Sequence, residues 1–340
     1  MTNCIKAAIA ALALLSSVRA EPTLSAEIDA LDAAGSQIAP KNIIFDDDYA
    51  LYADGMAAHY ILLELERAGY AKVLAVVADS SNTYSAPAMA SVNRAFGRAG
   101  IPVGAYHGSV TSGSSNSAWA QQIAAQFGTA GDVRSNYPNA VTTLRTALAA
   151  AANGSVTYVS TGFLTNLAAL LQSFPDSSSP LTGTQLVAAK VAEIVIMGGD
   201  YPTGSGEFNF TGDPESAAYV FAHSPVAVTG AGASLGASIM VRPPGGLNST
   251  TDPLTFALSL EGATSTGGYD PIAIHFAVMG PQHNYIIAGV GGVNTVNPSN
   301  GDNSWAATAG KTSYIAKLVG DSQLANVYNA IVARARFNRF

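Results

Sequence analysis

The feature that most constrains the fold is an alternation of short apolar runs with stretches of helical periodicity. Residues 72–78, 156–160 and 193–199 are short runs rich in β-branched or other apolar side chains, and such runs predict buried strands. Between the first strands, from Gly55 to Ala68, the apolar residues recur at helical spacing. The pattern continues along the chain and predicts strands at 42–45, 72–78, 101–108, 156–160, 193–199 and 226–230, and helices at 55–68, 86–100, 139–154 and 213–224.

Strand and helix signals that alternate at this spacing predict an α/β fold. We expect a Rossmann-like, parallel-rich central sheet with helices on both faces. The chain becomes rich in glycine after residue 230, and residues 313–336 are expected to be mostly helical. No break in composition marks a second domain, so residues 21–340 are expected to form a single domain.

Composition and charge exclude some classes of function. The chain has 340 residues, of which 48% are hydrophobic and 11% are charged, which supports a sizeable core and excludes a disordered chain. The formal charge of −7 gives no basic surface of the kind that binds nucleic acid, so we expect no nucleic-acid partner.

The first twenty residues have the pattern of a secretory signal peptide. Lys6 precedes an apolar stretch from Ala7 to Leu15, and Val18-Arg19-Ala20 forms an acceptable cleavage site. A membrane anchor is the alternative, but the stretch is too short to span a bilayer, and no later segment is long enough either. We therefore expect a secreted protein with no membrane partner. Cleavage also removes Cys4, the only cysteine, so the mature chain has no disulfide and no thiol nucleophile.

An acidic cluster follows the first predicted strand. Residues 46–48 are three consecutive aspartates, and Asp54 follows six residues later. In open α/β sheets, ligands bind beyond the carboxyl ends of the strands, where Asn82 and Thr161 are also expected. Carboxylate and carbonyl oxygens suit Ca²⁺, which tolerates irregular geometry. The alternative is a solvated loop in which one aspartate caps the following helix.

Five segments, in order along the chain, resemble the motifs of the inosine–uridine-type nucleoside hydrolases. The first is the acidic segment "IIFDDDYALYADGMAA", which looks like a divergent form of the N-terminal aspartate motif. The others are "VLAVVADSSN" (73–82), "VSTGFLTNLA" (159–168), "IVIMGGDYPTGSGEFNFTGDPESAAYVF" (194–221) and "GGYDPIAI" (267–274). The resemblance spans about residues 42–275 and implies a nucleoside hydrolase-like fold.

The resemblance implies a role for each matching residue. Asp48, Asp54, Asp270 and the carbonyl of Thr161 would bind Ca²⁺, and Asp48 would also act as the general base that activates water. The substrate-binding residues would be Asn82, Glu207, Asn209 and Asp270. Asn82 is also a common type of turn residue, so a purely structural role is its alternative.

The sequence departs from the family pattern at two of these positions. The family motif ends in two adjacent aspartates, whereas this chain has "ADGMA"; we align Asp54 with the metal-binding aspartate, and the other alignment would place Gly55 there. Tyr269 stands where many members have a histidine before the "DP" pair. As a catalytic residue it would donate a proton to the leaving base, or it would stack on that base.

The resemblance implies a Ca²⁺-dependent enzyme that hydrolyses the N-glycosidic bond of ribonucleosides into ribose and free base. The alternative is a non-catalytic protein on the same fold that binds a nucleoside or ribose. The sequence does not determine the oligomeric state, and a homo-oligomer stays an open alternative, since relatives often form dimers or tetramers.

Overall fold

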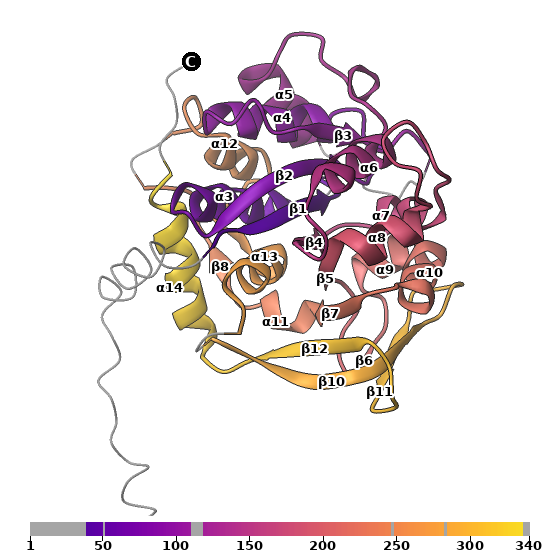
Figure 1. Cartoon of the computed structure of the whole chain (residues 1–340). Helices are drawn as coiled ribbons and strands as arrows, with labels where there is room; N and C mark the ends of the chain where they lie inside the picture. Colours follow the sequence, from indigo (N-terminus) through magenta and orange to yellow (C-terminus); the bar gives the residue numbers. More distant parts are fainter. Residues whose placement is uncertain (1–38, 50–51, 110–117, 246–247, 282–283, 336–340) are drawn as a thin grey trace, which may run out of the picture. The chain divides into compact units, whose positions relative to one another are not determined.

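The residues described in the computed structural model, 39–49, 52–109, 118–245, 248–281 and 284–335, form a ten-stranded sheet and a separate two-stranded one. The strand order in the large sheet is β3-β2-β1-β4-β5-β7-β12-β10-β11-β6 (Figure 1). Its strands are β1 (Lys41–Asp47), β2 (Ala71–Ala78), β3 (Val103–Ala105), β4 (Val156–Ser160), β5 (Val191–Met197), β6 (Thr203–Gly204), β7 (Ala227–Ala231), β10 (Tyr285–Val296), β11 (Asn303–Ala306) and β12 (Thr312–Lys317). The small sheet pairs β8 (Met240–Val241) with β9 (Thr266–Gly267).

The strands from β3 to β12 in this order are parallel, and β10, β11 and β6 extend the sheet in antiparallel pairs. This arrangement confirms the predicted α/β fold with a parallel-rich sheet. Because parallel strands end at the same edge, the connections that follow β1, β2, β4, β5 and β7 meet there.

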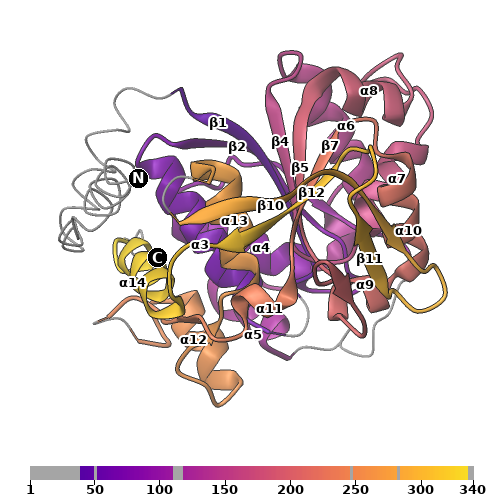
Figure 2. The same cartoon turned by 90° about the horizontal axis from the view of Figure 1, so that it is seen from below.

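Helices cover both faces of the sheet (Figure 2). One face carries α3 (Asp54–Arg67), α4 (Ser85–Ala95), α13 (Tyr269–Met279) and α14 (Asp321–Val332). The other carries α6 (Ala140–Ala150), α7 (Thr165–Gln172), α8 (Gly183–Lys190) and α10 (Pro214–His223). The remaining helices are α5 (Ala118–Phe127), the 3-10 turn η1 (Arg134–Asn136), α9 (Phe208–Gly212), α11 (Ala233–Gly236) and α12 (Pro253–Leu260).

Strand β1 shows why both faces are buried. Successive side chains of a strand point to opposite faces. Ile44 packs with Tyr158 and Leu167 in the core beneath α6 and α7, whereas the ring of Phe45 lies 5.3 Å from that of His59 on α3. A strand buried on both sides appears in the sequence as a continuous apolar run, here Ile43, Ile44 and Phe45.

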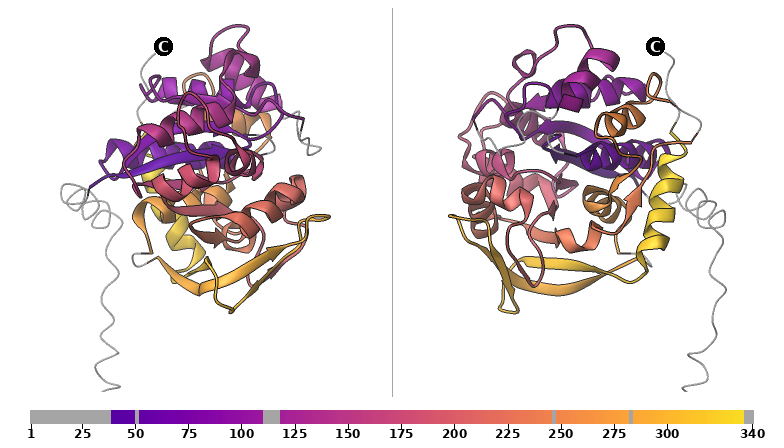
Figure 3. Two further views of the ribbon diagram at one scale, coloured as in Figure 1. Left: turned by 45° about the vertical axis from the view of Figure 1, so that its right-hand side comes forward. Right: turned by 180° about the vertical axis from the view of Figure 1, so that it is seen from behind.

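The expectation for residues 313–336 is wrong in its first part. Residues Thr312–Lys317 form β12 and only Asp321–Val332 are helical. The β-branched and aromatic side chains of "TSYIA" suit a strand, and tertiary pairing with β7 and β10 fixes it. Figure 3 shows β10 and β12 side by side. The predicted signal peptide lies outside the described residues. None of the described helices is long and apolar enough to cross a membrane.

Candidate active site

A cavity of about 410 Å³ opens at the carboxyl edge of the sheet. Its walls come from the ends of β1, β4 and β5 and from the starts of α3, α9, α11 and α13. The lining residues are Asp48, Tyr52, Asp54, Thr161, Met197, Gly206, Glu207, Phe208, Asn209, Ala233, Tyr269 and Asp270.

Most residues that the sequence predicted for the site line this one cavity. These are Asp48, Asp54, Thr161, Glu207, Asn209, Tyr269 and Asp270. Asn82 is not among the lining residues. It is 4% exposed, and its Oδ1 accepts a hydrogen bond from the backbone N–H of Tyr84 at 2.8 Å, as in an Asx turn. This turn geometry fits the structural role that we gave as the alternative for Asn82.

The turn after β1 is held in a fixed conformation. Tyr49 has a positive φ of 45°, which a tyrosine rarely adopts, and its N–H donates to Asp47 Oδ1 at 2.8 Å. Its hydroxyl bonds His59 Nδ1 at 2.9 Å. Ser80 Oγ donates to the carbonyl of Asp48 at 2.7 Å, and Ser85 Oγ donates to the carbonyl of Tyr49 at 3.1 Å. These contacts fix the backbone that carries Asp48.

Gly55 lets the first turn of α3 approach the acidic cluster. A Cβ at this position would lie 2.2 Å from Asp47 Oδ1 and 2.6 Å from Oδ2, which a side chain cannot tolerate. The carboxylate of Asp47 thus lies against the start of a helix, where negative charge is favoured. Asp54, the residue before, lines the cavity.

Beneath the cavity lies a layer of buried polar contacts that sequence inspection missed. Asp46 accepts hydrogen bonds from Tyr158 Oη at 2.5 Å and from Asn166 Nδ2 at 2.8 Å. Asp47 Oδ2 accepts from Thr161 Oγ1 at 2.5 Å. Burial raises the pKa of Asp46 to about 8 and that of Asp47 to about 6, although these hydrogen bonds oppose the shift. The signal in the sequence is the aspartate run itself, whose first two members, Asp46 and Asp47, are fully buried.

Glu207 and Asn209 line the cavity from the start of α9. Glu207 caps α9: its carboxylate accepts from the N–H groups of Gly199, Asn209 and Phe210 at 2.8–2.9 Å. Asn209 Nδ2 donates to the carbonyls of Thr161 and Met197, at 3.0 and 3.1 Å. These bonds join the end of β4 to the end of β5 and leave Asn209 Oδ1 to accept from a ligand.

Tyr269 and Asp270 begin α13. A Cβ at Gly267 would lie 2.4 Å from Tyr269 Cε2, so this glycine makes room for the ring. Burial and the charge of Asp54 raise the pKa of Asp270 well above its usual range. Burial, followed by the charge of Asp47, raises the pKa of Asp54 to about 7. Carboxylates on α3 and α13 therefore repel one another across the cavity.

The donor set of this cavity fits a hard cation in its chemistry. Three aspartates and a backbone carbonyl offer only oxygen, which Ca²⁺ prefers, and a divalent ion would relieve their repulsion. Among the residues that the structure describes, however, no three carboxylate, histidine or cysteine side chains come close enough together to form a ready-made metal site.

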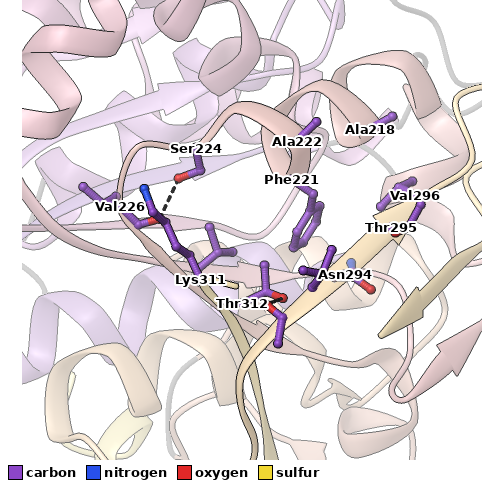
Figure 4. A pocket seen from close by; sticks show the side chains of 13 residues that line it. Ala218, Phe221, Ala222, Ser224, Val226, Asn294, Thr295, Val296, Lys311 and Thr312 are labelled. Atoms are coloured by element: carbon purple, nitrogen blue, oxygen red, sulfur yellow. Dashed lines mark hydrogen bonds between the residues drawn. The ribbon is translucent and has the colours of Figure 1, made fainter. Parts of the chain in front are cut away.

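A second cavity, of about 490 Å³, lies at the amino ends of β7 and β12, beneath α10 (Figure 4). Phe221, Val226 and Val228 contribute apolar walls, and Lys311 Nζ donates to the carbonyl of Pro225 at 2.8 Å. It contains none of the residues predicted for the site and no carboxylate. Although it is larger, we assign the chemistry to the cavity at the carboxyl edge.

Comparisons with known proteins identify the fold and the family of the chain. The chain resembles the structures of the inosine-uridine preferring nucleoside hydrolase from Bacillus anthracis (TM-score 0.64, 16% identity, 87% of this chain and 100% of that chain) and of the purine-preferring ribonucleoside hydrolase from Gardnerella vaginalis (0.60, 15%, 87% and 100%). It also resembles the type III effector protein XopQ complexed with adenosine diphosphate ribose (0.67, 15%, 92% and 98%). No curated protein sequence matches it.

The family model of the inosine-uridine preferring nucleoside hydrolases matches residues 43–257, more than half of the chain, including the segments that carry Asp48, Asp54, Thr161, Glu207 and Asn209. The cavity at the carboxyl edge of the sheet is assembled from these segments together with the start of α13. The chain therefore belongs to the inosine-uridine preferring nucleoside hydrolase family.

Proposed function

We propose that this protein is a secreted, single-domain, Ca²⁺-dependent hydrolase that cleaves the N-glycosidic bond of ribonucleosides into ribose and free base. The observation that carries the proposal is that Asp48, Asp54, Asp270 and Thr161 line one cavity with Asn209. The volume of this cavity lies within the range usual for small-molecule sites. The XopQ structure, which holds adenosine diphosphate ribose, offers an independent reason to expect a ribose-bearing ligand on this fold.

Asp48, Asp54, Asp270 and the carbonyl of Thr161 are the residues that would hold calcium. When bound, the ion would acidify the attacking water and hold the ribose hydroxyls. Asp48 lies on the turn that Ser80 and Ser85 fix, and it would take the proton of that water as general base.

The other lining residues would bind and orient the sugar. Asn209 Oδ1 would accept a hydrogen bond from a ribose hydroxyl, because its amide group is already committed to Thr161 and Met197. The carboxylates of Glu207 and Asp270 would favour the positive charge that develops on the sugar as the bond to the base breaks. Tyr269, at the edge of the same cavity, would face the base.

The experiment that tests this proposal is a reducing-sugar assay over a panel of purine and pyrimidine ribonucleosides. We expect ribose release that a calcium chelator abolishes and that added Ca²⁺ restores. Release that the chelator leaves unchanged would contradict the calcium requirement. Failure to hydrolyse any member of the panel, with nucleoside binding retained, would favour a non-catalytic binding protein instead.

A further inference from the structure

The charged side chains that line the candidate active site are all acidic. Asp48, Asp54, Glu207 and Asp270 line the cavity, and among the described residues that line it there is no lysine, arginine or histidine. Such a lining favours positive ligands over anionic ones, because charged walls of low dielectric focus the potential in a cleft.

Aromatic rings complete the cavity. Tyr52, Phe208 and Tyr269 line it, and the ring of Phe208 lies 5.6 Å from that of Phe163 behind it. Tyr52 is 59% exposed, so it stands toward the open side. Aromatic faces attract cations, and they attract planar cations such as a charged heterocycle by stacking as well.

The chemistry of bond cleavage favours the same ligands. When the bond between C1′ and nitrogen breaks, its electron pair stays on the base. A base that is cationic in the substrate then leaves as a neutral molecule, and no general acid is needed. Water adds to C1′ and its proton goes to Asp48, so ribose, a neutral base and one proton are the products. No histidine among the described lining residues could act as the acid that a neutral base requires.

We infer that this cavity prefers N-ribosides whose base carries a positive charge, such as N-ribosylpyridinium compounds and 7-alkylated purine nucleosides, over neutral nucleosides and over nucleotides. The inference rests on the proposed hydrolase function and names its preferred class of substrate. In this arrangement Tyr269 stacks on the charged base instead of donating a proton to it.

The test compares each cation with a neutral counterpart of nearly the same shape. The pairs are N-ribosylnicotinamide with its dihydro form, and 7-methylguanosine with guanosine. After division by the uncatalysed rate, we expect kcat/KM to be about tenfold or more higher for each cation than for its neutral counterpart. We expect kcat/KM to be about tenfold lower for a nucleoside 5′-phosphate than for the nucleoside itself. A tenfold ratio corresponds to about 1.4 kcal/mol.

A binding measurement makes the result independent of turnover. The 1-methylnicotinamide cation should bind at least about fivefold more tightly than neutral nicotinamide, and the difference should shrink as salt is raised. Tyr269→Phe, which keeps the ring, should preserve this preference, whereas Tyr269→Leu should remove most of it. Thermal melts of both variants would verify that they fold.

The outcomes separate the two claims. If no riboside is hydrolysed, the proposed hydrolase function is wrong, and the two nicotinamide ligands still test the charge preference. If guanosine is hydrolysed as efficiently as 7-methylguanosine and 1-methylnicotinamide binds no more tightly than nicotinamide, the inference is overturned while the hydrolase function stands. Equal effects of Tyr269→Phe and Tyr269→Leu on binding would likewise contradict the role of the ring.

Discussion

Replacement of Gly55 by alanine should destabilise the protein, although the same change stabilises most helices. In an ordinary exposed helix position, Gly→Ala is favourable by about 1 kcal/mol. Here the new methyl carbon would lie 2.2 Å from Asp47 Oδ1, and Asp47 is held by Thr161 Oγ1 at 2.5 Å and by the N–H of Tyr49 at 2.8 Å. The side chain can move only if these bonds break.

The expected magnitude follows from those contacts. Overpacking at a well-packed site costs about 1–3 kcal/mol, and each lost hydrogen bond to a carboxylate costs about 1.5–3 kcal/mol. Partial relaxation and the gain in helix propensity offset part of this, so we expect a net loss of about 2–4 kcal/mol in the free energy of unfolding.

Urea unfolding followed by far-ultraviolet circular dichroism measures this quantity. Gly100→Ala is a matched control, because a Cβ there meets no atom within 4 Å, and its free energy of unfolding should change by less than about 0.5 kcal/mol. A Gly55→Ala protein as stable as the parent, or more stable, would refute the close packing of α3 on Asp47.

Three further predictions concern pH, calcium and the binding wall. Burial lowers the pKa of His59 from its usual 6.5 to about 3, so the unfolded chain binds a proton that the folded one does not, and this contribution to stability is complete above pH 6.5 and lost as pH falls toward 3. Between pH 6 and pH 4, the free energy of unfolding of the parent protein should fall by about 1.4 kcal/mol per pH unit more than that of His59→Gln does. Urea unfolding at several pH values measures this, and an equal pH dependence for the two proteins would contradict it. Saturating Ca²⁺ should raise the midpoint of thermal unfolding, and Asp270→Asn should abolish most of the rise; an undiminished rise in the variant would place the ion elsewhere. Asn209→Leu should lower kcat/KM by about 10²-fold, since it removes the bonds to Thr161 and Met197 and the acceptor for ribose, and an unchanged value would exclude both roles.

Local sequence patterns predicted the parallel half of the sheet well. The strands at 72–78 and 156–160 and the helix at 55–68 are seen within about a residue of the predicted bounds, which is within the usual uncertainty of helix and strand ends. The strands are buried on both faces and the helix carries one apolar stripe, so the pattern of apolar residues in the sequence matches the pattern of burial. Beyond residue 230 this agreement ends. β12 pairs with β7 and β10, partners distant in the sequence, and no local pattern separates its apolar residues from a helix.

At the site, too, the sequence predicted some features and missed others. Apart from Asn82, the residues that the family motifs predicted for the site line the cavity, because each motif lies at the end of a strand or the start of a helix. They did not predict how the residues are held. Glu207 uses its carboxylate to cap α9, and Asn82 forms a turn, because backbone N–H groups nearby need acceptors. Gly55 has its role only because Asp47 lies against it in space.

The most direct test of the account is the rate of ribose release by Asp48→Asn at saturating Ca²⁺, compared with the parent protein. Asp302→Asn is a suitable control, because Asp302 is not among the cavity residues and accepts a hydrogen bond from Asn300 Nδ2 at 2.8 Å. The account predicts that Asp48→Asn lowers kcat by about 10²–10⁴-fold while Asp302→Asn leaves it unchanged. A rate for Asp48→Asn equal to that of the parent would contradict the assignment of Asp48 as the base, and with it the proposed active site.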